Sequence, residues 1–166
     1  FLTTTVLSNT PILIASSSCE IQNGIDTPVQ LHNVMKSGFK EIGSTQGEQS
    51  FNLSILCNGG ENNSGIATSN TISLSFDYNS DPTNNQVINN SAANSNKANG
   101  VGVELLWNMN GAKSPIQKTA KQNIGTVNSN QTIEYDIPLT ARYYQTATNV
   151  SAGIVTATAT VTIQYD

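Results

Sequence analysis

The chain has 166 residues, of which seven are Lys or Arg and eleven are Asp or Glu, so its formal net charge is -4. This length predicts a single domain. The few basic residues are scattered, which excludes the clustered positive charge that nucleic-acid binding requires. Hydrophobic residues make up 37% of the chain and favour a folded core over disorder. The longest purely apolar run, Ile12 to Ala15, is far shorter than a membrane span of roughly 20 residues.

The N-terminal segment alternates between two kinds of residue, as a β-strand does. One face of such a strand would carry Leu2, Thr4, Val6, Ser8, Thr10, Ile12 and Ile14. The middle of this face is polar and contains no glycine. The alternation predicts an extended segment, but it does not by itself indicate what the segment pairs with.

Two cysteines, Cys19 and Cys57, follow this segment. Asn, Ser and Thr supply 59 of the 166 residues, and in a weakly charged chain of this exported character one disulfide is the natural interpretation. Its 38-residue loop would contribute roughly 4 kcal/mol of stability. The alternative is two buried free thiols. A closed zinc site is not expected, since His32 is the only histidine.

Alternation with a period of two continues through the middle of the chain and predicts further strands. The alternating segments are residues 51–57, 72–76, 101–105 and 133–139. Between them, the polar residues 77–99 predict a long loop, and Asn110-Gly111 predicts a tight hairpin turn. Only one short helical turn is expected, at residues 34–39. The sequence therefore predicts an all-β, immunoglobulin-like sandwich with one disulfide.

The last segment alternates for longest. Its apolar face carries Gly153, Val155, Ala157, Ala159, Val161, Ile163 and Tyr165, and threonines dominate the opposite face. The small residues on the apolar face would leave shallow pockets, and no turn or partner strand follows before Asp166. Such a strand is a place where another strand could lie down. An ordinary half-buried strand has the same pattern, so alternation alone does not decide between the two.

These last residues resemble the C-terminal assembly motif of the chaperone–usher fimbrial pilins of Gram-negative bacteria. In that motif a glycine stands fourteenth from the end and a tyrosine stands next to last, as Gly153 and Tyr165 do. Three further features fit the same family in the same order: Cys19 paired with Cys57, the central strand in residues 98–105, and the strand of residues 137–143. The resemblance covers roughly residues 12 to 166.

The resemblance implies an incomplete sandwich that lacks its seventh strand and exposes a hydrophobic groove. A periplasmic chaperone would fill this groove with a strand and hold the C-terminal carboxylate, here that of Asp166. At the outer-membrane usher, the N-terminal extension of a neighbouring pilin would replace the chaperone strand. Val155, Val161 and Ile163 would line the groove walls, and Ala157 and Ala159 would leave it deep. The implied location is the extracellular fimbrium, reached through the periplasm.

The N-terminal segment bears on which kind of pilin this is. Residues 12–166 are expected to form the pilin domain. Residues 1–11 would be a linker, the remnant of a receptor-binding domain, or a donor extension. A donor extension usually carries a glycine at one pocket position, and the absence of one here favours the pilin domain of a two-domain tip adhesin. The alternation itself favours a shaft or minor subunit with its own donor strand.

Other candidate sites are weaker. Asp77, Asn79 and Asp81 have the spacing of a calcium loop but lack the glycine and glutamate that follow in an EF-hand, so a solvated turn is expected. His32 has no catalytic partner nearby, and no enzyme motif, metal site or cofactor is predicted. Trp107 could stack on a sugar, although a buried tryptophan is the more common case. The remaining alternative function is a self-sufficient, secreted glycan-binding sandwich.

Overall fold

A computed structural model describes residues 2–12, 17–22, 27–60 and 68–166. Within these ranges the chain is almost entirely β-structure, and its only helix, a three-residue 3₁₀ turn, is far too short to span a membrane. The elements are β1 (Leu2–Ile12), β2 (Ser18–Ile21), β3 (Thr27–Leu31), η1 (Lys36–Gly38), β4 (Thr45–Asn58), β5 (Ser69–Asp77), β6 (Ser80–Asp81), β7 (Asn84–Ile88), β8 (Val101–Met109), β9 (Ala112–Pro115), β10 (Gln122–Asn128), β11 (Thr132–Gln145) and β12 (Val155–Tyr165).

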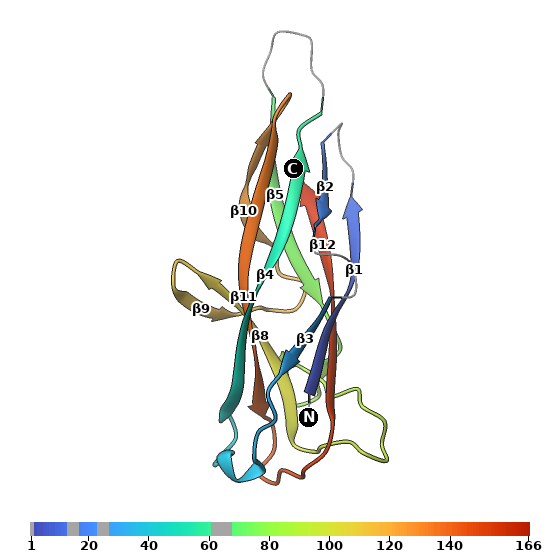
Figure 1. The fold of residues 1–166 in the computed structure, drawn as a ribbon, viewed down its shortest axis with the longest axis vertical. Coiled ribbons are helices and arrows are strands. Elements are labelled where there is room, and N and C mark those ends of the chain that lie inside the picture. Colours follow the sequence, from blue (N-terminus) through green and yellow to red (C-terminus); the bar gives the residue numbers. More distant parts are fainter. Residues whose placement is uncertain (1, 13–16, 23–26, 61–67) are drawn as a thin grey trace.

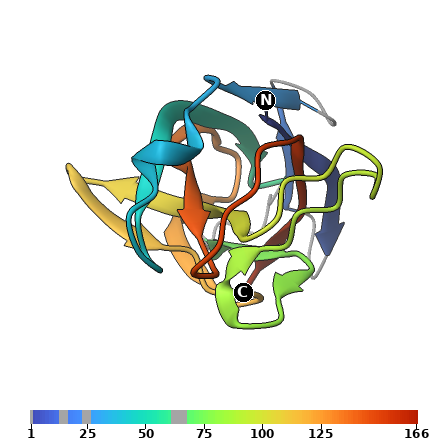
Figure 2. The same ribbon diagram turned by 90° about the horizontal axis from the view of Figure 1, so that it is seen from below.

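The strands form two sheets. One has the order β10-β5-β12-β1-β3, and the other has the order β2-β4-β11-β8-β7-β6, with β9 paired to β8. The molecule is elongated, with the N-terminal end and η1 towards one end and the C-terminus towards the other (Figure 1). Seen along the long axis, the sheets curl around a common core (Figure 2). The predicted all-β sandwich is confirmed.

The second sheet is built around the long antiparallel pair β4 and β11. Their register runs from Thr132 opposite Asn58 to Tyr144 opposite Thr45. Inward residues such as Ile55 and Leu139 are completely buried, because alternation along each strand places every second side chain in the core. Cys19 on β2 lies opposite Cys57 on β4, and the two form the predicted disulfide.

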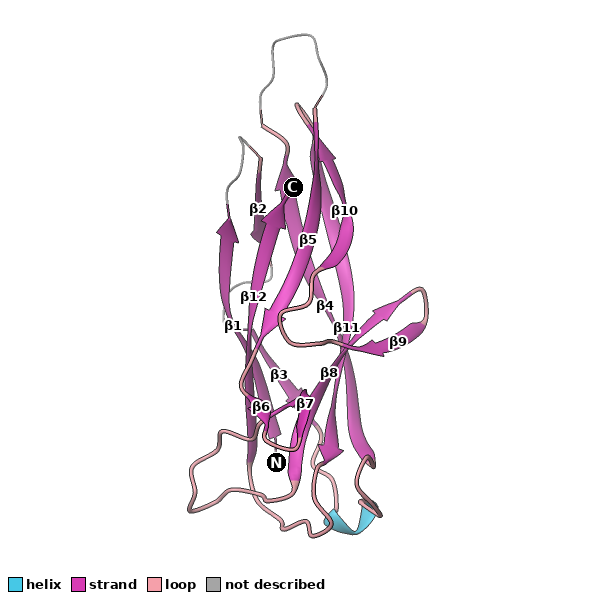
Figure 3. Ribbon diagram, turned by 180° about the vertical axis from the view of Figure 1, so that it is seen from behind, coloured by secondary structure: helices cyan, strands magenta, loops and turns pink. Residues whose placement is uncertain are grey.

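Two local predictions are confirmed and one is wrong. Asn110 and Gly111 both have positive φ and join β8 to β9 as a hairpin, and η1 is the expected short helical turn (Figure 3). The polar stretch of residues 77–99 is not one continuous loop, because it contains β6 and β7. Val87 and Ile88 of β7 are buried and pair with β8, so two apolar residues were enough to form a strand there.

Candidate strand-binding groove

The buried face of β12 contains every residue predicted to line the groove. Alternate positions are almost fully buried, and the residues between them are partly exposed. The buried positions are Val155, Ala157, Ala159, Val161, Ile163 and Tyr165. The sheet to which β12 belongs continues on one side with β5, which pairs with β12 from Thr160 to Tyr165. The other side of β12 is the edge at which an added strand was expected.

That edge is occupied by the chain's own N-terminal strand. β1 pairs with β12 in parallel, from Leu2 opposite Val155 to Ile12 opposite Gln164, and its far side pairs with β3 in antiparallel orientation. β1 therefore lies between β12 and β3 (Figure 1). Where the sequence predicted an open edge, the structure places the chain's own first strand beside β12. An exposed strand edge offers unpaired N–H and C=O groups, and a nearby extended segment satisfies them.

The pairing of β1 is interrupted. The register shifts between Val6, which lies opposite Ala159, and Ser8, which lies opposite Thr160, so Leu7 is one extra residue in β1. An extra residue of this kind is a β-bulge and reverses the alternation beyond it. The predicted common face of the even residues from Leu2 to Ile12 concerns side chains outside the described part of the structure, and Ile14 lies outside the described residues altogether.

Gly153, at the start of the assembly motif, is needed because another part of the chain approaches it closely. A Cβ atom on Gly153 would lie 2.5 Å from the amide nitrogen of Ala98 and 2.6 Å from the carbonyl oxygen of Asn96. Contacts this short between a Cβ atom and main-chain atoms force the backbone to move. The glycine thus allows the segment containing residues 96–98 to pack against the beginning of β12.

Asn90 holds this segment in place. Its Nδ2 donates to the carbonyl oxygens of Ala98, at 3.0 Å, and Ile154, at 2.9 Å, and its Oδ1 accepts from the amide of Thr156 at 2.9 Å. The side chain of Asn90 is buried and its polar atoms are used, as burial of an amide requires. Sequence reasoning missed Asn90, because nothing in a run of polar residues distinguishes the buried one.

Tyr165 fastens the other end of β12 to the opposite sheet. The amide of Cys19 donates a hydrogen bond of 2.6 Å to the Tyr165 hydroxyl. Burial raises the pKa of Tyr165 above its usual value, and the hydrogen bond to the backbone of Cys19 partly offsets the increase. The penultimate tyrosine is therefore joined to the strand that carries the disulfide.

Asp166 ends the chain beside β5. Its amide and carbonyl exchange hydrogen bonds of 3.0 and 2.8 Å with Thr71, and its side chain forms an ion pair of 3.2 Å with Lys121. Both charged side chains are about half exposed, so this pair contributes little to stability. The main-chain bonds hold the last residue in line with β12.

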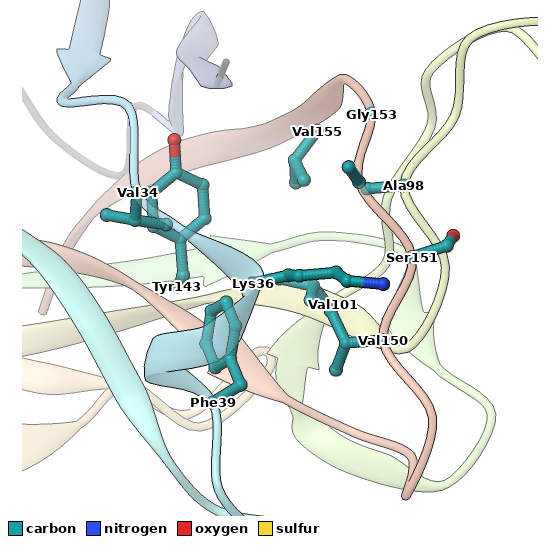
Figure 4. A pocket seen from close by; sticks show the side chains of 11 residues that line it. Val34, Lys36, Phe39, Ala98, Val101, Tyr143, Val150, Ser151, Gly153 and Val155 are labelled. Atoms are coloured by element: carbon teal, nitrogen blue, oxygen red, sulfur yellow. The ribbon is translucent and has the colours of Figure 1, made fainter.

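A cavity of about 130 Å³ lies at the opposite end of β12 (Figure 4). Its lining combines apolar side chains, such as Val34, Phe39 and Val155, with the polar residues Lys36 and Ser151. It adjoins Gly153 and Val155, which places it where β1 begins to pair with β12.

The other candidate sites named from the sequence, a sugar-stacking tryptophan, a histidine and a metal site, are not supported by the described residues. Trp107 is 6% exposed and its ring packs edge-to-face on Phe76, with centroids 5.4 Å apart, so it belongs to the core. The carbonyl oxygen of His32 accepts a hydrogen bond from Tyr143. Within the described ranges, no group of His, Cys, Asp or Glu side chains could hold a metal ion.

Comparison with known proteins identifies the family. The fimbrial protein family matches residues 8–166. The chain belongs to the chaperone–usher fimbrial pilins. It is 31% identical to a fimbria adhesin protein of Klebsiella pneumoniae over 162 residues, which are 98% of this chain and 49% of the adhesin. It is 28% identical to protein FhaE of Bordetella pertussis, over 83% of this chain and 35% of FhaE.

Solved structures of fimbrial proteins share the fold. The P pilus rod subunit PapA matches with a TM-score of 0.61 and 15% identity, over 89% of this chain and 99% of PapA. The CupB6 tip adhesin of Pseudomonas aeruginosa matches with a TM-score of 0.53 and 14% identity, over 96% of this chain and 40% of CupB6. This pilin therefore spans about half the length of the adhesin relative and about a third of FhaE.

Proposed function

We propose that the chain is the pilin domain of a two-domain tip adhesin and that it accepts a donor strand from a neighbouring pilin between β12 and β3. One observation carries this proposal: the first sheet is continuous only because β1, a strand from the end of the chain, lies between those two strands. The apolar face of β12 needs such a strand to be covered at its edge. Main-chain hydrogen bonds would supply affinity, and the alternating side chains would supply register.

The assignment to an adhesin is supported by coverage. The chain matches about half of the Klebsiella adhesin and 40% of the CupB6 tip adhesin, whereas it matches nearly all of the rod subunit PapA. A pilin domain that follows a receptor-binding domain accounts for the first two values. In that arrangement residues 1–11 are the connection between the domains, and the receptor domain contacts a host or other surface.

Assembly follows the family route in this proposal. In the periplasm a chaperone strand occupies the groove, and its basic residues bind the C-terminal carboxylate of Asp166. That carboxylate lies at the end of β12, and the Asp166 side chain is half exposed beside Lys121. At the usher the donor strand of the next subunit replaces the chaperone strand, and the finished fimbrium is extracellular. No step of this process requires the chain to act as an enzyme.

A shaft or minor subunit is the second candidate, and the extended form of β1 favours it. β1 forms strand pairs over eleven residues, so it has the length and conformation of a donor strand. The glycan-binding sandwich has less support, because Trp107 is in the core and is not available to stack on a sugar.

The test of the groove is a variant that lacks residues 2–12, unfolded by heat with and without a synthetic peptide of those residues. We expect a lower midpoint for the variant, and recovery with the peptide because it binds only the folded state. An unchanged midpoint without any effect of the peptide would contradict the groove. If the variant does not fold alone, it is refolded with the peptide present, and retention of the peptide in the folded complex is measured.

The two candidates are separated by different measurements. An adhesin isolated from its bacterium should have about twice the mass of this chain, since the chain covers 49% of its adhesin relative. A shaft subunit should instead assemble with further copies of itself by exchanging β1. Linear oligomers of the purified chain, lost when residues 2–12 are deleted, would favour the shaft subunit over the adhesin.

A further inference from the structure

We propose that Tyr135 blocks the free edge of β10 and thereby prevents this edge from pairing with β10 of a second copy of the chain. The edge in question is the side of β10 that faces away from β5. It lies at the other end of the first sheet from β3, and β5 stands between it and β12. The proposal therefore goes beyond the proposed function and does not depend on the groove. Side-chain hydrogen bonds along β10 carry it.

β10 is an edge strand without the usual protection. Among the described strands it pairs with β5 alone. A free edge offers N–H and C=O groups to any extended segment, and proteins commonly block such edges with lysine or proline. None of the seven residues of β10 is charged or a proline. Two copies of this strand would therefore meet without the repulsion that like charges cause.

The Tyr135 hydroxyl occupies both main-chain groups of Thr126. The Thr126 amide donates to the hydroxyl at 3.0 Å, and the hydroxyl donates to the Thr126 carbonyl oxygen at 2.5 Å. An N–H and a C=O group of one residue are what a strand exchanges with an antiparallel neighbour. Tyr135 lies on β11, in the other sheet, and reaches across to this edge. Its hydroxyl therefore stands where a further strand would bond.

Neighbouring groups of the β10 edge are also bonded within the chain. The Gly125 amide donates to Oδ1 of Asn123, and the Asn128 amide donates to Oε1 of Gln131, each at 2.9 Å. The Gln131 amide in turn donates to the Asn128 carbonyl oxygen at 3.2 Å. The register with β5 also shifts between Asn123 and Gly125, and such a bulge is a further way to prevent edge pairing.

Gly125 makes room for the tyrosine. A Cβ atom on Gly125 would overlap the end of the Tyr135 ring, at 2.5 Å from its Cζ atom. The φ of Gly125 is +151°, which a residue with a side chain rarely adopts. Tyr135 is partly buried, whereas Thr126 on the edge is exposed. The absence of a side chain at Gly125 thus allows the ring to lie close against the edge.

The test replaces Tyr135 by phenylalanine, which keeps the ring and removes only the hydroxyl. We expect hydrogen exchange at the Thr126 amide to become about tenfold faster in the monomer, since it loses one hydrogen bond. Sedimentation velocity over a range of concentrations should then show dimers in excess of the wild-type level. The β10 amides should be protected in those dimers. Tyr144→Phe is the matched control, because Tyr144 lies on the same strand and its hydroxyl is near Gly43.

A purely structural tyrosine predicts a different result. Loss of its hydroxyl would lower the midpoint of thermal unfolding without adding any dimer, and that outcome would overturn the proposal. Dimers that protect the amides of β3 or β12 and leave those of β10 exposed would also overturn it. Such dimers would arise from strand exchange at the groove, so failure of the edge proposal is distinguishable from failure of the proposed function.

Two further variants test the same edge independently. Gly125→Ala should push the ring away while the hydroxyl is kept, and it should produce the same dimers. Thr126→Pro, added to Tyr135→Phe, removes the exposed N–H group at a strand edge, where proline is tolerated. This double variant should return to the wild-type level of dimer. Persistence of β10-protected dimers in the double variant would show that the Thr126 amide is not the group that Tyr135 blocks.

Discussion

β11 and β1 are both long strands, but they are held in different ways. β11 lies between β4 and β8, is antiparallel to both, and shares with β4 a register that begins one residue away from the disulfide-bonded Cys57. β1 lies between β12 and β3, is parallel to β12, and changes register after its first five residues. β11 is an integral part of the core, whereas β1 lies where a donor strand binds in the function proposed above. In that proposal a single sandwich combines a permanent sheet, the one that contains β4 and β11, with a sheet that is completed by a strand from another subunit.

Loss of the disulfide should have the largest effect on the permanent sheet. Replacement of both Cys19 and Cys57 by serine removes the constraint on a 38-residue loop and should lower the free energy of unfolding by roughly 4 kcal/mol. Denaturant unfolding measures the change. Peptide binding by the fraction that remains folded should be retained. A loss of stability below about 1 kcal/mol would contradict the prediction that the Cys19–Cys57 disulfide is a main source of stability of the permanent sheet.

Gly153→Ala should disturb the start of the groove strand. Its new Cβ would lie 2.5 Å from the amide nitrogen of Ala98, so we expect a loss of about 3 kcal/mol, the upper range for a strained backbone. Gly111→Ala is the control, because its φ is also positive but no atom lies within 4 Å of the added carbon. It should lose about 1 kcal/mol. Equal losses in thermal unfolding would contradict close packing at Gly153.

Ala157→Phe should fill the floor of the groove. Ala157 is completely buried, so the larger ring should cost about 2 kcal/mol and block uptake of a donor peptide. The disulfide should still form. Thr158→Phe is the matched control, because Thr158 is the next residue on the same strand and is partly exposed. Calorimetric binding of the peptide by Ala157→Phe at wild-type affinity would show that the groove face is assigned incorrectly.

Tyr165→Phe should have a smaller effect, of about 1 kcal/mol, because it removes one buried hydrogen bond and leaves the Cys19 amide without that partner. The expected loss appears in denaturant unfolding, and hydrogen exchange at the amide of Cys19 should become faster. If that exchange stays slow, the hydroxyl is not what protects the amide.

Alkaline pH should lower the free energy of unfolding, because it deprotonates a second buried tyrosine. Burial raises the pKa of Tyr143 to about 12, above the usual value of 10. Between these values the unfolded chain loses this proton and the folded chain keeps it. Stability is therefore full below pH 10 and decreases as the pH rises towards 12. Tyr143→Phe should make the midpoint of unfolding depend less on pH in this range, and an unchanged dependence would exclude Tyr143 as a cause.

Much of the fold could be predicted from the sequence because it depends on local patterns. Period-two alternation located β12 and its buried face, and the pair Asn110-Gly111 located a hairpin. The two cysteines and the exported character of the composition predicted the disulfide, and the family resemblance agreed with it. Two assignments remain predictions: that a chaperone binds the carboxylate of Asp166, and that a domain boundary lies near residue 11. A chaperone complex tests the first, and a longer chain tests the second.

The missed features depend on contacts between distant segments. Alternation predicted that residues 2–12 are extended, but it carries no information on which strand they pair with. The bulge at Leu7 depends on the register with β12, which the N-terminal segment alone does not contain. Asn90 looks like any other residue of a polar loop, and its importance arises only where Ala98 and Ile154 come together.

The length of β1 has a mechanical consequence. Leu2 lies beside the beginning of β12, and Ile12 lies beside its end, so the strand runs along the groove from one end of the sandwich towards the other. If a donor strand takes the place of β1, as proposed above, these eleven residues can extend up to about 36–40 Å from Ile12. A group joined ahead of Leu2 would then no longer be held beside the beginning of β12. It would be connected to the domain only through the extended segment that starts near the other end of β12.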